Sequence, residues 1–249
     1  MSSTRRERVA PRSDWMQVAT TGAVLAGVFV ALALVLAALG LGVVGRHGGG
    51  AIQGWDDTVA RWFLHHRTHL VKVSKVIAKV LDAGPLGLIV IVITAGLLAR
   101  RQGARALIPL GGYVGGEALV YLTRAYIHRP RPLTAVYPAP GAIQGVHETS
   151  YSFPSGHATG AAATLMCLAG LAAITWRIWW PWLIGALAAL AVGGSRLVLG
   201  VHWFSDVAFG LIVAFPLALV VTATLANLTW PFPWLRPHPG PGTERSEAA

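Results

Sequence analysis

The chain has 249 residues, of which 54% are hydrophobic and only 12% are charged, and its mean hydropathy is +0.57. A soluble domain carries about 25% charged residues, so this balance excludes an ordinary soluble protein. The formal net charge of +10 does not indicate a nucleic-acid partner, because the cationic residues cluster between apolar runs, where they flank membrane spans.

Six apolar segments follow one another along the chain, and several approach the ~20 residues that a helix needs to cross a bilayer. They are residues 18–44, 84–99, 106–127, 157–176, 183–199 and 207–228. The second is short unless the preceding helix continues into it. The only cysteine, Cys167, can form no intrachain disulfide and is interpreted as a small core or lipid-facing residue. We therefore expect an all-α integral membrane protein with six transmembrane helices bundled over residues 18–228.

The segments outside these spans are polar or amphipathic. Residues 1–17 are basic and predict a cytoplasmic tail, and residues 229–249 are rich in Pro and Gly and predict a disordered tail. Residues 70–81 have the pattern of an amphipathic helix, with Lys72, Lys75 and Lys79 on one face. We interpret this segment as a basic helix that lies against lipid headgroups.

The distribution of cations indicates how the spans are oriented. With the N-terminus inside, the basic turn that holds Arg100, Arg101 and Arg105 is also inside, as the positive-inside rule prefers. The basic stretch 46–82 opposes this orientation, but its charges are spread over a long segment. In either orientation, the end of the third span, the start of the fourth and the junction of the fifth and sixth share one membrane face. We expect that face to be the extracytoplasmic side of the inner or plasma membrane.

The start of the fourth span has the residues of an anion site. Pro154 biases the chain before it to be extended, Ser155 is a good helix N-cap, and Gly156 lets a ligand approach the backbone. Free N–H groups at a helix start attract an anion, and His157 adds a titratable group beside it. By itself, this stretch also fits a capped helix with an incidental histidine.

Two further clusters belong to the same membrane face. His202 and Asp206 are four residues apart, so a helix would place them on one side, where the carboxylate could hold one ring nitrogen and leave the other free. Arg124, Arg131 and Arg196 lie at helix ends, where arginines often reach to headgroups. Each cluster alone has such a structural explanation. Together on one face, they indicate phosphate chemistry, which needs positioning and positive charge.

The full pattern resembles the three-part signature of the type 2 phosphatidic acid phosphatase superfamily. The parts are Arg124-(six residues)-Arg131-Pro132, Pro154-Ser155-Gly156-His157, and Ser195-Arg196-(five residues)-His202-(three residues)-Asp206. The family usually begins the first part with lysine. Arg124 keeps the charge and can bind phosphate through two hydrogen bonds, so we expect function to survive this difference.

The resemblance implies a role for each matched residue. His202 would be the nucleophile that forms a phosphohistidine, and Asp206 would orient it and stabilise its positive charge. His157 would protonate the leaving oxygen and then activate water. The phosphate oxygens would be held by Arg124, Arg131, Arg196, Ser155 and the backbone N–H of Gly156.

The residues predict no metal and no other cofactor. Three arginines can supply the positive charge around a phosphate, and the chain has no compact carboxylate cluster of the kind that Mg²⁺ binds. Nearby arginines should lower the pKa values of the two histidines, whereas Asp206 should raise that of His202.

The resulting hypothesis is metal-independent hydrolysis of a membrane lipid phosphate or diphosphate at an interfacial active site. Candidate substrates are undecaprenyl diphosphate, phosphatidate and phosphatidylglycerol phosphate. The first is favoured, because a compact six-span chain with an outward site resembles bacterial members that recycle that carrier. The alternatives are a membrane phosphatase of soluble phosphate esters and a non-catalytic lipid-binding or transport protein. Vanadate-dependent haloperoxidases share these site residues by family resemblance, but they are soluble, which the six spans oppose.

Four other polar residues lie near the motifs. His147 and Glu148 are interpreted as solvated loop residues rather than substrate contacts, and Arg129 as a headgroup or loop contact. Glu117 lies about two helical turns before Arg124. It could steady Arg124 through water or serve helix packing.

Overall fold

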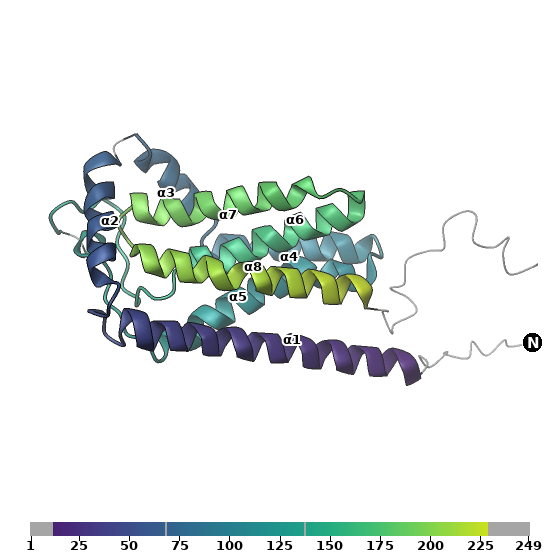
Figure 1. The fold of residues 1–249 in the computed structure, drawn as a ribbon. Coiled ribbons are helices and arrows are strands. Elements are labelled where there is room, and N and C mark those ends of the chain that lie inside the picture. Colours follow the sequence, from purple (N-terminus) through teal and green to yellow (C-terminus); the bar gives the residue numbers. More distant parts are fainter. Residues whose placement is uncertain (1–11, 68, 137, 229–249) are drawn as a thin grey trace, which may run out of the picture.

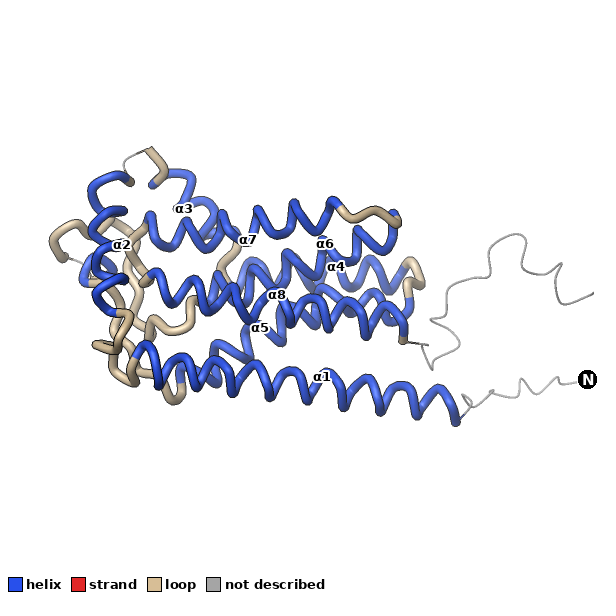
Figure 2. The backbone as a smooth tube through the Cα atoms, viewed as in Figure 1, coloured by secondary structure: helices blue, strands red, loops and turns tan. Residues whose placement is uncertain are grey.

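The computed structural model describes residues 12–67, 69–136 and 138–228, and the regular elements in these ranges are all helical (Figure 2). The α-helices are α1 (Arg12–Leu39), α2 (Gln53–His66), α3 (Val71–Val80), α4 (Ala83–Ala99), α5 (Ile108–Arg124), α6 (Ala162–Trp176), α7 (Trp180–Val198) and α8 (Phe204–Asn227). Short helical turns extend three of them, namely Gly40–Val44 after α1, Gly103–Leu107 before α5 and His157–Ala161 before α6. A further turn, Leu133–Ala135, lies in the loop between α5 and α6. The predicted all-α class is confirmed.

The membrane spans match the six predicted segments. Five helical segments are long and apolar enough to cross a bilayer, and they are Met16–Val44, Gly103–Arg124, His157–Trp176, Trp180–Val198 and Phe204–Asn227. The sixth candidate is the pair of α3 and α4, which together pass the same test but are bent by 54° at their junction. The predicted tails fall mostly outside the described residues, and α1 already begins at Arg12.

The bend between α3 and α4 has a local cause. Asp82 has extended backbone angles, and α4 starts directly after it. Pro85 is the third residue of α4, where its missing N–H needs no intrahelical partner. In one continuous helix, the proline ring would clash with the carbonyl of Leu81. The chain therefore ends α3, turns and starts a new helix.

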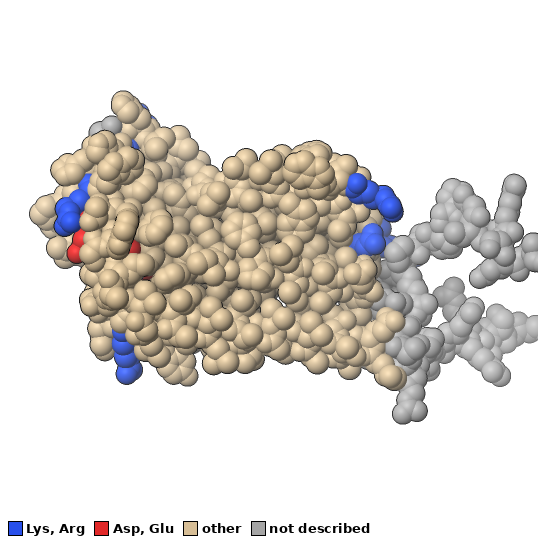
Figure 3. Space-filling view, viewed as in Figure 1, with Lys and Arg blue, Asp and Glu red and all other residues tan. Residues whose placement is uncertain are grey.

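The spanning helices run side by side along one axis, while α2 and α3 gather at one end of the bundle (Figure 1). On the face shown in Figure 3, the Lys and Arg side chains lie at the two ends, and the surface between them is uncharged. Such an uncharged band fits the hydrocarbon core of a bilayer. The end that carries α2 and α3 is also where α8 begins, so it holds the C-terminal part of the signature.

Glycines let the central helices approach closely. At Gly116 of α5, an added Cβ would lie 2.7 Å from the Cα of Gly160, in the turn that opens α6. At Gly112, it would lie 2.6 Å from the Sγ of Cys167, which is fully buried in the core. Small residues at helix contacts are typical of membrane bundles, where backbone proximity replaces the hydrophobic drive. This packing holds the turn at His157–Ala161 against α5.

We expect Gly116→Ala to lower the melting temperature in detergent, because the new methyl group must push α5 away from Gly160. The matched control is Gly96→Ala in α4, where an added Cβ meets nothing within 4 Å. Alanine is normally the better helix former by about 1 kcal/mol, so the control should melt at the same temperature or higher. Equal melting temperatures for the two variants would contradict the close packing of α5.

Candidate active site

A polar cavity of about 190 Å³ lies where the three motifs meet, and we call it the arginine cavity. Of the predicted site residues, it is lined by Arg124, Arg131, Gly156, His157, Arg196 and His202. Ser155 and Asp206 do not line it, since both are fully buried behind the cavity wall. The structure thus brings together residues that lie up to 78 positions apart between Arg124 and His202.

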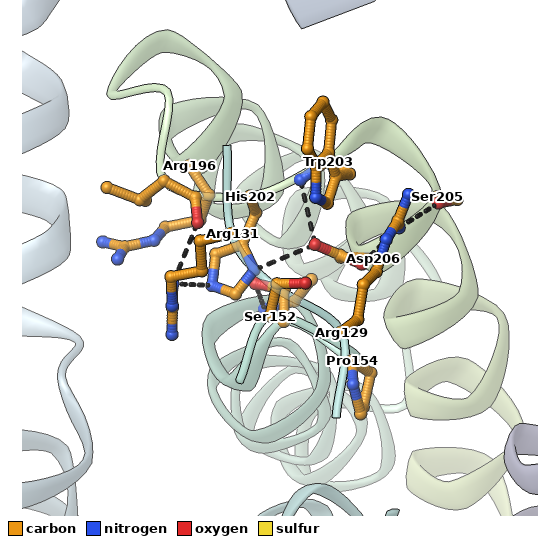
Figure 4. A network of polar contacts seen from close by, with 12 residues as sticks. Arg129, Arg131, Ser152, Pro154, Arg196, His202, Trp203, Ser205 and Asp206 are labelled. Carbon is orange, nitrogen blue, oxygen red and sulfur yellow. Dashed lines mark hydrogen bonds and ion pairs between the residues drawn. The ribbon is translucent and has the colours of Figure 1, made fainter. Parts of the chain in front are cut away.

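His202 is held by the first turn of α8, although it is not part of that helix. Asp206 is the third helical residue, and its Oδ2 accepts the N–H of Trp203 at 2.9 Å, as a capping carboxylate does. The same oxygen lies 3.4 Å from Nδ1 of His202 (Figure 4). The expectation that both residues sit on one helical face was therefore wrong in detail, because α8 begins only at Phe204. Gly200, with φ of +69°, forms a turn shortly before His202.

The tautomer of His202 follows from its two contacts. Nη1 of Arg131 donates to Nε2 of His202 at 2.9 Å, and a guanidinium can only donate. Nε2 is therefore the unprotonated nitrogen, and Nδ1 carries the proton that faces Asp206. Burial lowers the pKa of His202 well below 6.5, and Arg131, Arg196 and Arg124 lower it further. The rise in pKa that was expected from Asp206 is thus smaller than these lowering effects. The ring is a neutral imidazole with a lone pair on Nε2.

His157 is oriented by a backbone group instead of a carboxylate. Its Nε2 lies 3.0 Å from the carbonyl oxygen of Ala78 in α3, and a carbonyl can only accept. Nε2 therefore keeps its proton, and Nδ1 is the nitrogen left to exchange one. Ser155 caps the following turn, since its Oγ accepts the N–H of Ala158 at 3.4 Å. The N–H of Ser155 donates to the carbonyl of Asp206 at 3.1 Å, which ties the second motif to the third.

The arginines are held by the loop between α5 and α6. Arg124 donates to the carbonyl of Pro154 at 3.0 Å, and Arg131 donates to the carbonyl of Ser150 at 2.8 Å and to its Oγ at 2.9 Å. Burial lowers the pKa of Arg131 to about 10, and Arg124 and Arg196 act in the same direction against Glu148. Arg131 thus remains a cation at neutral pH.

Glu148 was interpreted as a solvated loop residue, and the structure corrects this. Its Oε1 accepts from Arg196 at 2.6 Å, and its Oε2 lies 3.5 Å from Arg131. It also lines the arginine cavity. A carboxylate thus lies among the cations that would receive a phosphate, so a substrate must compete with it. No local pattern in the sequence indicates this contact, because it joins positions 48 residues apart.

Arg129 was interpreted as a headgroup or loop contact, which is wrong. Its side chain is fully buried and forms ion pairs with Asp56 of α2 at 2.6 Å and with Oδ1 of Asp206 at 2.8 Å (Figure 4). Asp56, which the sequence did not single out, also accepts from the Oγ of Ser205 at 2.6 Å and its N–H at 2.8 Å. We call Asp56, Arg129 and Asp206 the buried charge chain.

One sequence signal could have located Arg129. Arg129 and Arg131 each precede a proline, which biases both to extended backbone. In an extended segment, side chains two residues apart point the same way. Arg131 was assigned to the site, so Arg129 should point there too, and the two contact Asp206 and His202 respectively.

Glu117 also lines the arginine cavity, half-buried in α5. It has no ion pair with Arg124 within 4 Å among the described residues, and its carboxylate packs across Gly160. The contact supports the helix-packing interpretation of Glu117. Within the described ranges, no group of three or more His, Cys, Asp or Glu side chains is placed to hold a metal ion.

Comparisons with known proteins identify the family to which the chain belongs. The model of the PAP2 superfamily matches residues 105–230, about half of the chain, and includes all three motifs. Phosphatidylglycerophosphatase B of Bacillus subtilis (strain 168) is 31% identical over 127 residues, which are 49% of this chain and 59% of that protein. Undecaprenyl-diphosphatase of Sulfolobus acidocaldarius is 39% identical over 66 residues, 25% of this chain and 28% of that protein. The matches thus span less than two thirds of either curated relative.

A solved structure extends the similarity to most of the fold. It is the crystal structure of a transmembrane PAP2-type phosphatidylglycerolphosphate phosphatase from Bacillus subtilis, with a TM-score of 0.63 and 26% sequence identity. The match covers 80% of this chain and 94% of the solved one. The chain is a multi-pass membrane protein of the PAP2 superfamily.

We expect Asp56→Asn to destabilise the protein by about 3–5 kcal/mol, the usual cost of removing one partner of a buried ion pair. The matched control is Asp57→Asn, since Asp57 is half-buried and, among the described residues, accepts a hydrogen bond only from Gln53, at 2.9 Å. Thermal melting in detergent should separate the two variants. An unchanged melting temperature for Asp56→Asn would show that the buried charge chain does not support the fold.

Proposed function

We propose that the chain hydrolyses phosphate esters or anhydrides of membrane lipids through a phosphohistidine on His202, without a metal. One observation carries this proposal. His202, His157 and three arginines line a single cavity of about 190 Å³. That combination supplies a nucleophile, a proton donor and a positively charged receptor for one phosphate.

The first chemical step forms the P–N bond. The phosphate displaces the guanidinium of Arg131 from Nε2 of His202, and the arginines then bind its oxygens. Nε2 attacks phosphorus, and the proton on Nδ1 stays with the ring, so the imidazolium is stabilised by Asp206. His157 enters this step as an imidazolium with a proton on each nitrogen, and the bond to the leaving oxygen breaks as Nδ1 donates its proton to that oxygen. Catalysis here depends on positioning and on charge around the equatorial oxygens.

The second step returns the enzyme to its starting state. Nδ1 of His157, now without a proton, takes one from water, and the resulting hydroxide attacks phosphorus. The P–N bond breaks, and its electron pair returns to Nε2 of His202. Inorganic phosphate leaves, and both histidines have the protonation with which they began.

The surroundings of the arginine cavity favour a lipid substrate. A neighbouring cavity of about 420 Å³ shares Glu117, Val120, Arg124 and Ser150 with it and reaches Tyr121, whose side chain is 78% exposed on the outer surface of α5. The phosphate site thus borders a surface that faces the bilayer, and a lipid tail can lie along α5. The names of the two curated relatives, a phosphatidylglycerophosphatase and an undecaprenyl-diphosphatase, support lipid phosphates as substrates. Undecaprenyl diphosphate remains the favoured candidate because of the compact six-span chain and the outward site.

We expect the purified protein in mixed micelles to release phosphate from at least one of undecaprenyl diphosphate, phosphatidylglycerol phosphate and phosphatidate in the presence of excess EDTA. His202→Ala should lower this rate by several orders of magnitude, because the covalent step is lost. A soluble sugar phosphate in the same panel tests the alternative substrate class. Loss of activity in EDTA, with recovery in Mg²⁺, would overturn the metal-independent mechanism, and unchanged turnover in His202→Ala would overturn the nucleophile.

The active site is proposed to face the extracytoplasmic side, because α4 runs to the other end of the bundle (Figure 1) and the basic turn with Arg100 and Arg101 directly follows it. A cysteine at Gln144, an exposed position in the loop before the site, should react with a membrane-impermeant thiol reagent in intact cells. Its matched control is Gln102→Cys, which should react only after the cells are opened. The reverse pattern would invert the topology. The native Cys167 is buried and should not contribute.

A further inference from the structure

A third cavity lies beside His157, the proposed proton donor. It has a volume of about 550 Å³ and shares four lining residues with the arginine cavity, namely Asp82, Glu148, His157 and Arg196. Its other walls are α3 and the segment before Glu148, which bring Lys75, Lys79 and His147 to it. We call it the lysine cavity. His157 and Arg196 form part of both cavities, so the two adjoin at the proposed reaction centre.

The lysines of α3 are not equivalent. Lys75 donates to the carbonyl of Gln144 at 2.9 Å, whereas Lys79 is exposed and has no ion pair or hydrogen bond among the described residues. Lys72 shares their helix face but does not line the cavity. The sequence interpretation assigned all three to headgroups. In the structure, Lys75 and Lys79 adjoin the site, whereas Lys72 does not.

The direction of phosphoryl transfer points toward this cavity. Attack by His202 and departure of the leaving oxygen are roughly in line, so the leaving group extends on the side away from His202. That side is marked by His157, which protonates the leaving oxygen under the proposed function. The group bonded directly to that oxygen therefore lies next to the lysine cavity, and the lipid tail beyond it can still continue along α5.

We propose that the lysine cavity binds a second phosphate carried by the leaving group, so that the preferred substrates are lipids with two phosphates. This inference rests on the proposed function. His202 attacks the terminal phosphorus, the bond to the leaving oxygen breaks, and His157 protonates that oxygen. The retained phosphate stays on the lipid and is held by Lys79 and Lys75 through charge-assisted hydrogen bonds. A polyprenyl diphosphate and phosphatidylglycerol phosphate both have this chemistry, whereas phosphatidate has a single phosphate.

The test compares Lys79→Gln with Lys72→Gln in the full-length protein. The measured quantity is kcat/KM for undecaprenyl diphosphate and for phosphatidylglycerol phosphate, each divided by kcat/KM for phosphatidate. For Lys79→Gln, the ratio of the preferred two-phosphate lipid should fall about tenfold, the effect of one lost charge-assisted hydrogen bond. Lys72→Gln should leave both ratios at the wild-type value. Whichever ratio falls identifies the spacing of the two phosphates that the cavity accepts.

A binding measurement tests the second-phosphate site independently of turnover. Methylenediphosphonate, which cannot be hydrolysed, should raise the melting temperature of the wild type at lower concentrations than methylphosphonate does. Lys79→Gln should abolish this preference, and Lys72→Gln should keep it.

The outcomes separate the subsite from the reaction. Unchanged ratios and an unchanged diphosphonate preference in Lys79→Gln would overturn the subsite while phosphatidate turnover upholds the phosphatase. An equal loss on all three lipids would also overturn it and would assign Lys79 to general headgroup attraction. If no lipid were hydrolysed but the preference depended on Lys79, the proposed function would fall and the second-phosphate site would stand. If neither turnover nor preference were found, both would fall.

Discussion

The buried charge chain of Asp56, Arg129 and Asp206 is the constraint on which the rest of the site depends. All three side chains are fully buried, and a buried ion is costly unless partners satisfy it. Arg129 bridges the two carboxylates, and it also donates to Ser205 and Gln53. The chain joins α2, the loop after α5 and the start of α8. These elements can therefore be displaced only by leaving a charge unpaired.

This network determines how each histidine can react. Asp206 has one oxygen toward Arg129 and the other toward Trp203 and His202, so the imidazole receives a carboxylate of fixed orientation. In the described part of the chain, the ring of His157 is hydrogen-bonded only to the carbonyl of Ala78. Under the proposed function His202 becomes a phosphorylated cation, which benefits from a full negative charge beside it. A group that must give up and regain a proton is better served by a neutral acceptor, which favours neither state strongly.

The bilayer explains why the site is built at one end of the bundle. Several cations within a hydrocarbon core would be very costly, whereas the end of the helices allows access to water and headgroups. The break between α3 and α4 contributes directly to the site. Because α3 turns away at Asp82, it brings the carbonyl of Ala78 to His157 and places Lys75 and Lys79 beside the reaction centre. A straight span through this region could not provide both.

The sequence by itself determined the membrane spans and the three motifs, because both depend on local patterns. Apolar length predicts a span, and the spacing from His202 to Asp206 is set within one turn of chain. Only the tertiary structure decided that Arg129 is buried, that Glu148 enters the arginine cavity and that Asp56 completes the charge chain. The ion pairs behind these three facts join residues 48, 73 and 77 positions apart. Such pairings follow from how the helices pack, and periodicity along one chain segment has no information about which charges become partners across the bundle.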